Sequence, residues 1–393
     1  MKSSMASGNW NYPTTIWFGP SRIQDLAEAC RQCGIERPLI VTDPGLLGLA
    51  PLTATEQVLC EANFAVSVFS DIRPNPVGDN VTAGVSAFRA GKHDGVVALG
   101  GGSAIDAAKA IAFQSGQTLN LWSFEDVGNN YLDANSGQIA PIVAVPTTSG
   151  TGSEVGRVAV IVNEEEQRKV LIFHPKMMPQ IVILDPQLTV GLPPTITAAT
   201  GMDALAHCLE AYCAPGFHPM ADGIAVQGIQ LIKQWLPIAY RDGSDIEARG
   251  HMQVAATMGA TAFQKGLGAI HALSHPVGAI YDCHHGLTNA AFMPYVFSFN
   301  RAAISDRLPL LAKALDLPGG DEEVAYESLL NWILLLRKRL NIPHTLADMG
   351  LDDRQIDKVC AMAAQDPTAA TNPVPLNEEN LRSIYLAALN GTL

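Results

Sequence analysis

The sequence predicts an α/β domain with a parallel sheet over residues 1–190, followed by an all-α domain over residues 191–393. In the first half, short β-branched runs alternate with helix-like stretches, the pattern of a parallel sheet with crossover helices. After Gly191-Leu192-Pro193-Pro194 the strand signals stop, and long Ala- and Leu-rich segments continue to the C-terminus. A chain of 393 residues is also longer than one hydrophobic core usually organises, which favours two domains.

The expected sheet is built from short apolar and β-branched runs. Several are apolar throughout, as strands covered on both faces should be. Helix-like stretches connect them, for example 103–113, where Ala104, Ile105 and Ala108 recur with helical spacing. In chain order, the expected strands are 14–18, 38–42, 65–69, 95–99, 141–145, 158–162 and 181–184.

The second half is expected to be helical throughout. Leu329, Ile333 and Leu336 belong to the apolar stripe of one core helix. The basic triplet 337–339 follows directly and fits the C-terminal turn of that helix, where the dipole favours positive charge. We therefore interpret the triplet as a helix end rather than as a binding patch.

Composition and charge exclude several classes of protein. With 48% hydrophobic and 16% charged residues, the chain can bury enough apolar surface to fold, which excludes global disorder. A net charge of −13 repels phosphate backbones and anionic lipids, so we expect no nucleic-acid partner and no membrane partner. Residues 1–12 lack the apolar core of a signal peptide, and no stretch is long enough to cross a bilayer, which predicts a cytoplasmic protein.

The cysteines indicate reduced thiols. Seven cysteines are an odd number, and they are scattered through a large chain, unlike a disulfide framework. Cys30 and Cys33 form a Cys-x-x-Cys within a helix-like run, with no second pair to complete a zinc site. We therefore expect ordinary burial on a helix face for this pair.

A glycine turn indicates a phosphate-binding site in the first domain. The strand 95–99 leads into Gly100-Gly101-Gly102-Ser103 and then into a helix, so backbone N–H groups can approach an anion at the positive helix end. Asp43 follows the strand 38–42, where a carboxylate can bind both ribose hydroxyls and repel a 2′-phosphate. These features predict a Rossmann-like, dinucleotide-binding domain that prefers NAD to NADP. A turn role for Asp43 before Pro44-Gly45 is the alternative.

A polar loop, 146–154, follows the strand 141–145. Its hydroxyl groups and glycines are able to cradle phosphates or to line a nicotinamide pocket, although a solvated turn has a similar composition.

Histidines and one aspartate in the second domain predict a divalent metal site. Asp203 and His207 are four residues apart, which places both on one face of a helix. The segment 268–286 adds four of the chain's 10 histidines, and each buried imidazole needs a hydrogen-bond partner or a metal. Three imidazoles and one carboxylate would leave an open position for substrate. The four added histidines are His271, His275, His284 and His285.

Spacing alone leaves the choice of ligands open. Either His271 or His275 is able to join His284 or His285 in binding a metal. Pro276 adds an expected kink or break in the helix, because proline removes a backbone donor and disfavours helical geometry at His275.

Together these features resemble the iron-containing, or group III, alcohol dehydrogenase family. The resemblance runs from Ile16-Trp17-Phe18-Gly19 through the glycine turn and the polar loop to both histidine segments. It implies a homodimer or larger homo-oligomer and a Fe²⁺ site, which Zn²⁺ or another divalent metal could also fill. The implied metal ligands are Asp203, His207, His271 and His285.

The resemblance also implies roles for other residues. His275 matches a family histidine beside the substrate and the nicotinamide, and we expect it to relay a proton. We expect His284 to contact either the substrate or one of the residues that bind the metal. The implied dinucleotide contacts are Asp43, Asn75, Gly101, Gly102, Ser103, Thr147, Thr148, Thr151 and Lys169.

The expected activity is hydride transfer between NAD and a primary alcohol or diol, or the corresponding aldehyde. Few Lys or Arg residues surround His207 and 271–285, which favours a neutral substrate over a phosphorylated or carboxylated one. The turn 263–266 departs from the family pattern, so the resemblance does not define the substrate preference. The alternatives are a polyol (glycerol-type) or hydroxy-acid dehydrogenase of the same superfamily and, from another class, a nucleotide-binding sensor whose histidines are structural.

Overall fold

The computed structural model describes residues 12–393. The segment 1–12, which is predicted not to be a signal peptide, lies outside this range apart from Tyr12. Two compact units are present: an α/β unit of residues 13–192 and 243–257, and a helical unit of residues 193–242 and 258–393. Across the described residues, no helix combines the length and the hydropathy that a membrane crossing requires.

The α/β unit is built on a parallel sheet of six strands, as the alternating pattern predicts. The strand order β1-β8-β5-β4-β2-β3 requires crossover connections, and helices supply them. The four central strands are buried because both sheet faces are covered. The strands are β1 (Thr15–Phe18), β2 (Pro38–Val41), β3 (Ser67–Phe69), β4 (Gly95–Gly100), β5 (Ile142–Pro146) and β8 (Ile181–Leu184).

One expected strand lies outside this sheet. β6 (Val158–Asn163) pairs antiparallel with β7 (Arg168–Phe173). The sequence predicted a strand at β6 but none at β7. Only four residues separate them, which is enough for a hairpin but too few for a crossover helix. The acidic turn and the mixed polarity of β7 concealed this strand.

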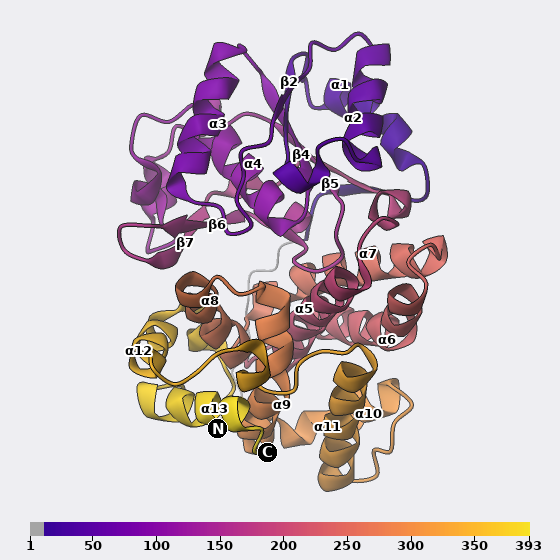
Figure 1. Ribbon diagram of the computed structural model, residues 1–393, viewed down its shortest axis with the longest axis vertical. Helices are drawn as coiled ribbons and strands as arrows, with labels where there is room; N and C mark the ends of the chain where they lie inside the picture. The colour runs from indigo at the N-terminus through magenta and orange to yellow at the C-terminus, as the bar shows by residue number, and fades with distance from the viewer. Residues whose placement is uncertain (1–11) are drawn as a thin grey trace, which may run out of the picture. The chain divides into compact units, whose positions relative to one another are not determined.

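Helices cover both faces of the parallel sheet (Figure 1). α1 and α2 lie on one side, where Leu26, Leu59 and other apolar side chains pack against Val97, Val143 and neighbouring sheet residues. α3 and α4 lie on the other side, and α4 is buried along most of its length. Their bounds are α1 (Leu26–Gln32), α2 (Ala50–Glu61), α3 (Gly78–Ala90) and α4 (Gly102–Gln114).

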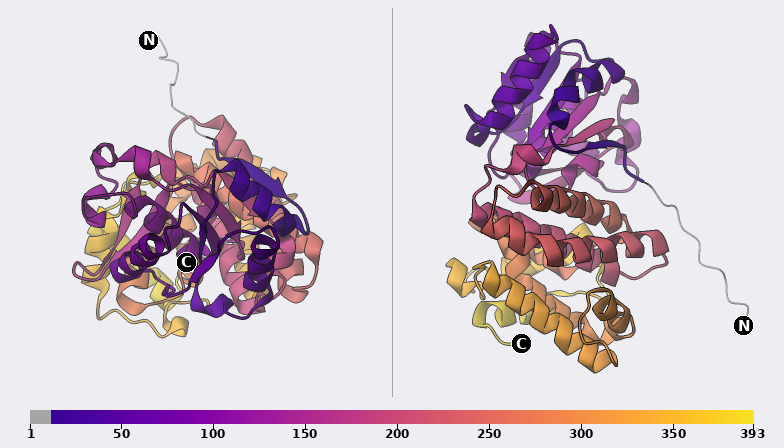
Figure 2. Two further views of the ribbon diagram at one scale, coloured as in Figure 1. Left: turned by 90° about the horizontal axis from the view of Figure 1, so that it is seen from above. Right: turned by 90° about the vertical axis from the view of Figure 1, so that its right-hand side faces the viewer.

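The helical unit is organised around α5, which is buried on nearly every side. An apolar helix of this kind is stable only when other helices surround it. In Figure 2 the helices of this unit, coloured red to yellow, form stacked layers. The helices that follow the sheet are α5 (Pro194–Cys213), α6 (Pro219–Arg241), α7 (Ile246–Ala262), α8 (Ala269–Tyr281), α9 (His285–Ile304), α10 (Leu308–Ala314), α11 (Glu322–Arg339), α12 (Ile356–Gln365) and α13 (Glu378–Asn390).

A buried arginine completes the backbone of α9. Pro294 lies inside this helix and has no N–H, so it cannot bond to the carbonyl of Ala290. The Arg337 guanidinium donates to the carbonyls of Ala290 and Ala291 at 3.3 and 3.2 Å. The basic triplet is the last turn of α11, as expected, but Arg337 is fully buried and supports the neighbouring helix.

Candidate metal centre and dinucleotide site

Three helices bring the four predicted metal ligands together. Asp203 and His207 lie one turn apart on α5, His271 is on α8, and His285 is the first residue of α9. Oδ1 of Asp203 lies 3.9, 3.8 and 3.7 Å from Nε2 of His207, His271 and His285, respectively. Four ligands about 2.1 Å from one ion in tetrahedral geometry lie about 3.4 Å apart, close to these distances. The ligand atoms of Asp203, His207 and His271 also lie within 4.8 Å of one another, whereas Nε2 of His285 is placed by its distance to Asp203.

The charge at this cluster fits a cation. Asp203 is 2% exposed and His271 also 2%, and within residues 12–393 no lysine or arginine pairs with Asp203. A buried carboxylate without a counter-charge is costly, and a divalent ion supplies that charge. Burial lowers the pKa of His271, but the carboxylates of Glu210 and Asp203 outweigh burial and raise it. The same negative field would attract a metal ion.

Glu210 orients the His271 ring. Its Oε2 lies 2.5 Å from Nδ1 of His271, and its Oε1 accepts a 2.7 Å hydrogen bond from the backbone N–H of Ile270. This contact leaves Nε2 of His271 facing Asp203, the arrangement of many metal-binding histidines. Sequence analysis missed Glu210, although it follows His207 by three residues on the same face of α5.

Two glycines allow the helices to approach this cluster. A Cβ on Gly286 of α9 would lie 2.3 Å from the carbonyl oxygen of Ala199, and one on Gly259 of α7 would lie 3.0 Å from Cβ of His207. Both distances are shorter than ordinary contacts, so a side chain at Gly286 would push α9 away from α5. The position of His285 relative to Asp203 therefore depends on a glycine.

His275 lies beside the cluster. Its Nδ1 is 2.8 Å from Oδ2 of Asp366, and its ring is stacked on His285 with an interplanar angle of 15°. Burial would raise the pKa of Asp366, but the His275 imidazole and hydrogen bonds from Thr368 outweigh burial and lower it. Of the kink or break expected at Pro276, the break does not occur, because α8 continues through this residue to Tyr281. Asp366 was missed because 91 residues separate it from His275.

His284 has a backbone role at the start of α9. Its carbonyl accepts hydrogen bonds from the N–H groups of Leu287 and Thr288 at 3.0 and 3.2 Å, while its side chain is exposed. The residue therefore caps the helix that carries His285.

The glycine turn and the polar loop meet at the carboxyl ends of β4 and β5. Gly100 has a φ of +142°, which glycine adopts without strain. A Cβ on Gly102 would lie 2.5 Å from Cγ2 of Thr151, and one on Gly101 would lie 3.2 Å from Cγ2 of Thr148. The N–H of Thr147 donates to the carbonyl of Gly100 at 2.9 Å. The start of α4 is thus packed against the threonine side chains of the polar loop.

Asp43 lies at the same edge of the sheet. Its Oδ1 accepts a 2.9 Å hydrogen bond from the N–H of Gly45, so it does cap the turn that was its alternative role. Its Oδ2 would lie 3.3 Å from a Cβ on Gly100, which places the carboxylate beside the glycine turn. Burial raises the pKa of Asp43, and the Gly45 hydrogen bond offsets part of that effect.

Asn75 and Lys169 lie on two segments next to the glycine turn, the loop before α3 and the strand β7. The Ser103 hydroxyl donates to the carbonyl of Pro74, which ties the start of α4 to the loop that carries Asn75. Lys169 on β7 pairs with Val162, whose N–H donates to the carbonyl of Pro76 at 2.8 Å. All nine predicted dinucleotide contacts thus lie on connected segments of the α/β unit.

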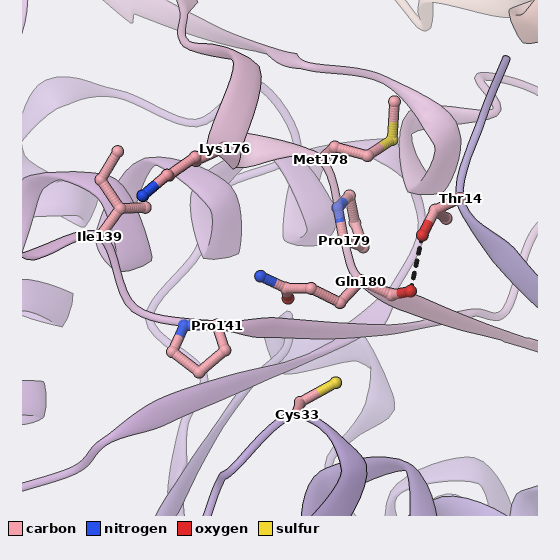
Figure 3. A pocket seen from close by; sticks show the side chains of 8 residues that line it. All are labelled: Thr14, Cys33, Ile139, Pro141, Lys176, Met178, Pro179 and Gln180. Atoms are coloured by element: carbon pink, nitrogen blue, oxygen red, sulfur yellow. Dashed lines mark hydrogen bonds between the residues drawn. The ribbon is translucent and has the colours of Figure 1, made fainter. Parts of the chain in front are cut away.

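A separate pocket lies at the opposite edge of the parallel sheet (Figure 3). Thr14, Pro141 and Gln180 line it, and each directly precedes a strand. Ligands of open α/β sheets bind at the carboxyl ends of the strands, and none of the predicted site residues lines this pocket.

The cysteines do not form a second site. Burial raises the pKa of Cys30 to about 12 and that of Cys33 to about 11, so both are protonated thiols at neutral pH. All seven cysteines are free, which agrees with the expectation of reduced thiols.

Comparison with known proteins identifies the family. Residues 13–186 match the iron-containing alcohol dehydrogenase family, and residues 197–389 match its C-terminal part. The chain is 39% identical over 372 residues to a 4-hydroxybutyrate dehydrogenase of Cupriavidus necator, covering 92% of this chain and 94% of that protein. It is 34% identical to an NAD-dependent methanol dehydrogenase of Bacillus methanolicus, covering 97% of this chain and 100% of that protein.

A solved structure agrees with this assignment. The crystal structure of a 1,3-propanediol oxidoreductase matches with a TM-score of 0.93 and 34% identity, covering 98% of this chain and 100% of that one. An α/β unit with a parallel sheet and a helical unit are the expected fold of the family, and the relatives are oxidoreductases rather than sensors. The chain therefore belongs to the iron-containing alcohol dehydrogenase family.

Proposed function

We propose that this enzyme transfers hydride between NAD and a small primary alcohol or diol, or the corresponding aldehyde, with one divalent metal. The observation that carries this proposal is the convergence of Asp203, His207, His271 and His285, of which the first three are buried. Relatives named as methanol and 1,3-propanediol dehydrogenases support the reaction class.

The α/β unit supplies the residues that would bind NAD. Gly101, Gly102 and Ser103 offer backbone N–H groups at the start of α4, where the helix dipole attracts a pyrophosphate. Asp43 would accept hydrogen bonds from ribose hydroxyls and repel a 2′-phosphate. The remaining polar side chains would contact the dinucleotide along the polar loop and the hairpin: Asn75, Thr147, Thr148, Thr151 and Lys169.

The helical unit supplies the residues that would hold the metal. Asp203, His207, His271 and His285 offer one carboxylate and three imidazoles, a donor set that suits Fe²⁺, Zn²⁺, Co²⁺ and Ni²⁺. A bound divalent ion supplies Lewis acidity toward the substrate oxygen, and bound NAD supplies the hydride acceptor. Glu210 would keep the His271 ring in its ligating orientation.

His275 and Asp366 would handle the substrate proton. The Asp366 carboxylate fixes the tautomer of His275 through Nδ1, so Nε2 is left to exchange a proton. Thr368 donates to Oδ1 of Asp366 through its N–H and its hydroxyl, at 2.9 and 2.6 Å, which holds the carboxylate in place. A general acid–base group of this kind typically contributes about 10²–10⁴-fold to a rate.

A hydroxy-acid substrate is the second candidate. The 39% identity to a 4-hydroxybutyrate dehydrogenase favours it. The scarcity of Lys and Arg near the histidine segments favours a neutral alcohol instead. Both candidates share the same metal and dinucleotide residues, so only substrate comparison separates them.

The direct test is to load the metal-free protein anaerobically with Fe²⁺ or Zn²⁺ and to measure NAD reduction. Methanol, ethanol, 1,3-propanediol, glycerol and 4-hydroxybutyrate serve as substrates. We expect NADH formation with a primary alcohol or diol and a strong preference for NAD over NADP. A higher kcat/KM for 4-hydroxybutyrate than for 1,3-propanediol would select the hydroxy-acid candidate. No reduction with any metal or alcohol would contradict the proposal.

Replacing His275 tests its role separately. We expect His275→Ala to lower kcat about 10²-fold or more while the metal content stays at the wild-type level. Asp366→Asn should lower kcat in the same direction and change its pH profile, because the His275 tautomer is no longer fixed. Loss of the metal from His275→Ala would instead make His275 a ligand.

A further inference from the structure

Asn289 is, with Glu210, a polar side chain at the metal cluster that the sequence did not predict. It lies one turn after His285 on α9 and is 0% exposed. Its Nδ2 is 2.7 Å from Oδ1 of Asp203, 3.2 Å from Nε2 of His271 and 3.1 Å from Nε2 of His285. The amide therefore covers the face formed by three of the four ligand atoms, and His207 is the one it does not contact.

The orientation of this amide is explained by the Asp203 carboxylate. An amide N–H bonds more strongly to an ionised carboxylate than to a neutral acceptor. Oδ1 of Asn289 is buried and has no hydrogen-bond partner among residues 12–393, so the bond to Asp203 must outweigh that cost. A carboxylate oxygen has two lone-pair directions, so Oδ1 of Asp203 is able to accept from Asn289 and to bind a cation together.

We propose that Asn289 is a positioning residue of the metal centre. Its amide holds Asp203 and closes the face formed by Asp203, His271 and His285. The amide would keep exchangeable ligands away from this face, so that substrate or water would have to reach a bound metal from another direction. The inference rests on the proposed function, because it requires a metal at the cluster.

Two substitutions separate the hydrogen bond from the closure of the face. Asn289→Leu removes the amide but keeps the space filled, whereas Asn289→Ala also opens the space to water. Thr288→Val is the matched control, because Thr288 is also 0% exposed on α9 but its hydroxyl donates to the backbone carbonyl of His285 and not to a ligand atom. NAD affinity and the unfolding midpoint of each variant report whether the protein is folded.

Co²⁺ serves as the probe, with its affinity measured by chelator competition and its coordination number read from visible absorption. We expect both Asn289 variants to weaken Co²⁺ binding about 10–100-fold, as for other groups that orient metal ligands. Asn289→Leu should keep the wild-type band intensity, and Asn289→Ala should lower it as water adds to the ion. Thr288→Val should match the wild type in both measurements.

Two results would overturn the role of Asn289. One is a Co²⁺ affinity in both Asn289 variants equal to that of Thr288→Val. The other is stronger visible bands in Asn289→Leu than in the wild type, because a lost ligand would mean that the amide itself binds the metal. Failure of the wild-type protein to bind one Co²⁺ per chain would overturn the proposed function instead.

Discussion

The dinucleotide region and the histidine cluster are built from different kinds of groups. In the α/β unit, the candidate site consists largely of backbone N–H groups and small hydroxyl side chains, and glycines keep the space open. In the helical unit, ionisable side chains are buried together and carry an unbalanced negative charge. Binding of a dinucleotide in the first region should therefore depend on shape, and binding of a metal in the second should depend on charge. Substitutions should affect the two regions separately.

The largest effect is expected from removing the charge of the cluster. Asp203→Asn keeps the shape of the side chain but leaves three imidazoles without an anionic ligand. Because a Lewis-acid metal lowers a barrier by several kcal/mol, we expect turnover to fall at least about 10³-fold, with loss of bound metal. Metal analysis and isothermal titration with NAD are the measurements. NAD affinity should stay within about twofold of the wild type, and retention of wild-type metal content would contradict the charge-based account.

The complementary change fills the space in the α/β unit. Gly102→Ala places a Cβ 2.5 Å from Thr151, which forces the start of α4 and the polar loop apart. We expect NAD affinity to fall about 10-fold or more, equivalent to about 1.4 kcal/mol, with metal content unchanged. Gly191→Ala is the control, because a Cβ at that position would have no atom within 4 Å. Equal NAD affinity in the two variants would show that the glycine turn does not contact the cofactor.

A smaller effect is expected at the helix that carries His285. Arg337→Met removes the donor to Ala290 and Ala291 and leaves the buried Ala290 carbonyl, which faces Pro294, without a partner. We expect the free energy of unfolding to fall by about 2 kcal/mol, and metal affinity to fall slightly as α9 loosens. Chemical denaturation measures the change. Lys338→Met, at an exposed position of the same turn, should be nearly neutral, and an equal loss there would contradict this role of Arg337.

The smallest effect is a pH-dependent contribution to the α/β unit. The Arg168 guanidinium bonds to both carboxylate oxygens of Glu125, at 2.5 and 2.9 Å, and lowers the pKa of Glu125 below its ordinary value of 4.5. A lowered pKa means that the contribution is present above pH 4.5 and is lost as the pH falls through the folded-state pKa. Because both side chains are partly exposed, Glu125→Gln should cost less than about 1 kcal/mol at pH 7. The denaturation curves of the wild type and Glu125→Gln should differ at pH 7 and approach each other at pH 3.5. A stability difference between the two proteins that is the same at both pH values would contradict the ion pair.

The two regions also differ in what the sequence reveals. Helical spacing placed Asp203 and His207 on one face, because periodicity is a local property of the chain. The parallel strands were predicted for the same reason, since each apolar run is continuous in sequence. Asn289 and Asp366 were not predicted, because their contacts with distant residues arise only when helices pack together. β7 was missed because its polarity is mixed and its partner β6 has the same pattern as the sheet strands.

The most direct test of the central claim is anomalous X-ray diffraction from crystals of the Zn²⁺-loaded protein. The account predicts one strong anomalous peak per chain, about 2.0–2.2 Å from Oδ1 of Asp203 and from Nε2 of His207, His271 and His285. A peak bound by other residues, or no peak at this cluster in crystals that contain Zn²⁺, would contradict it.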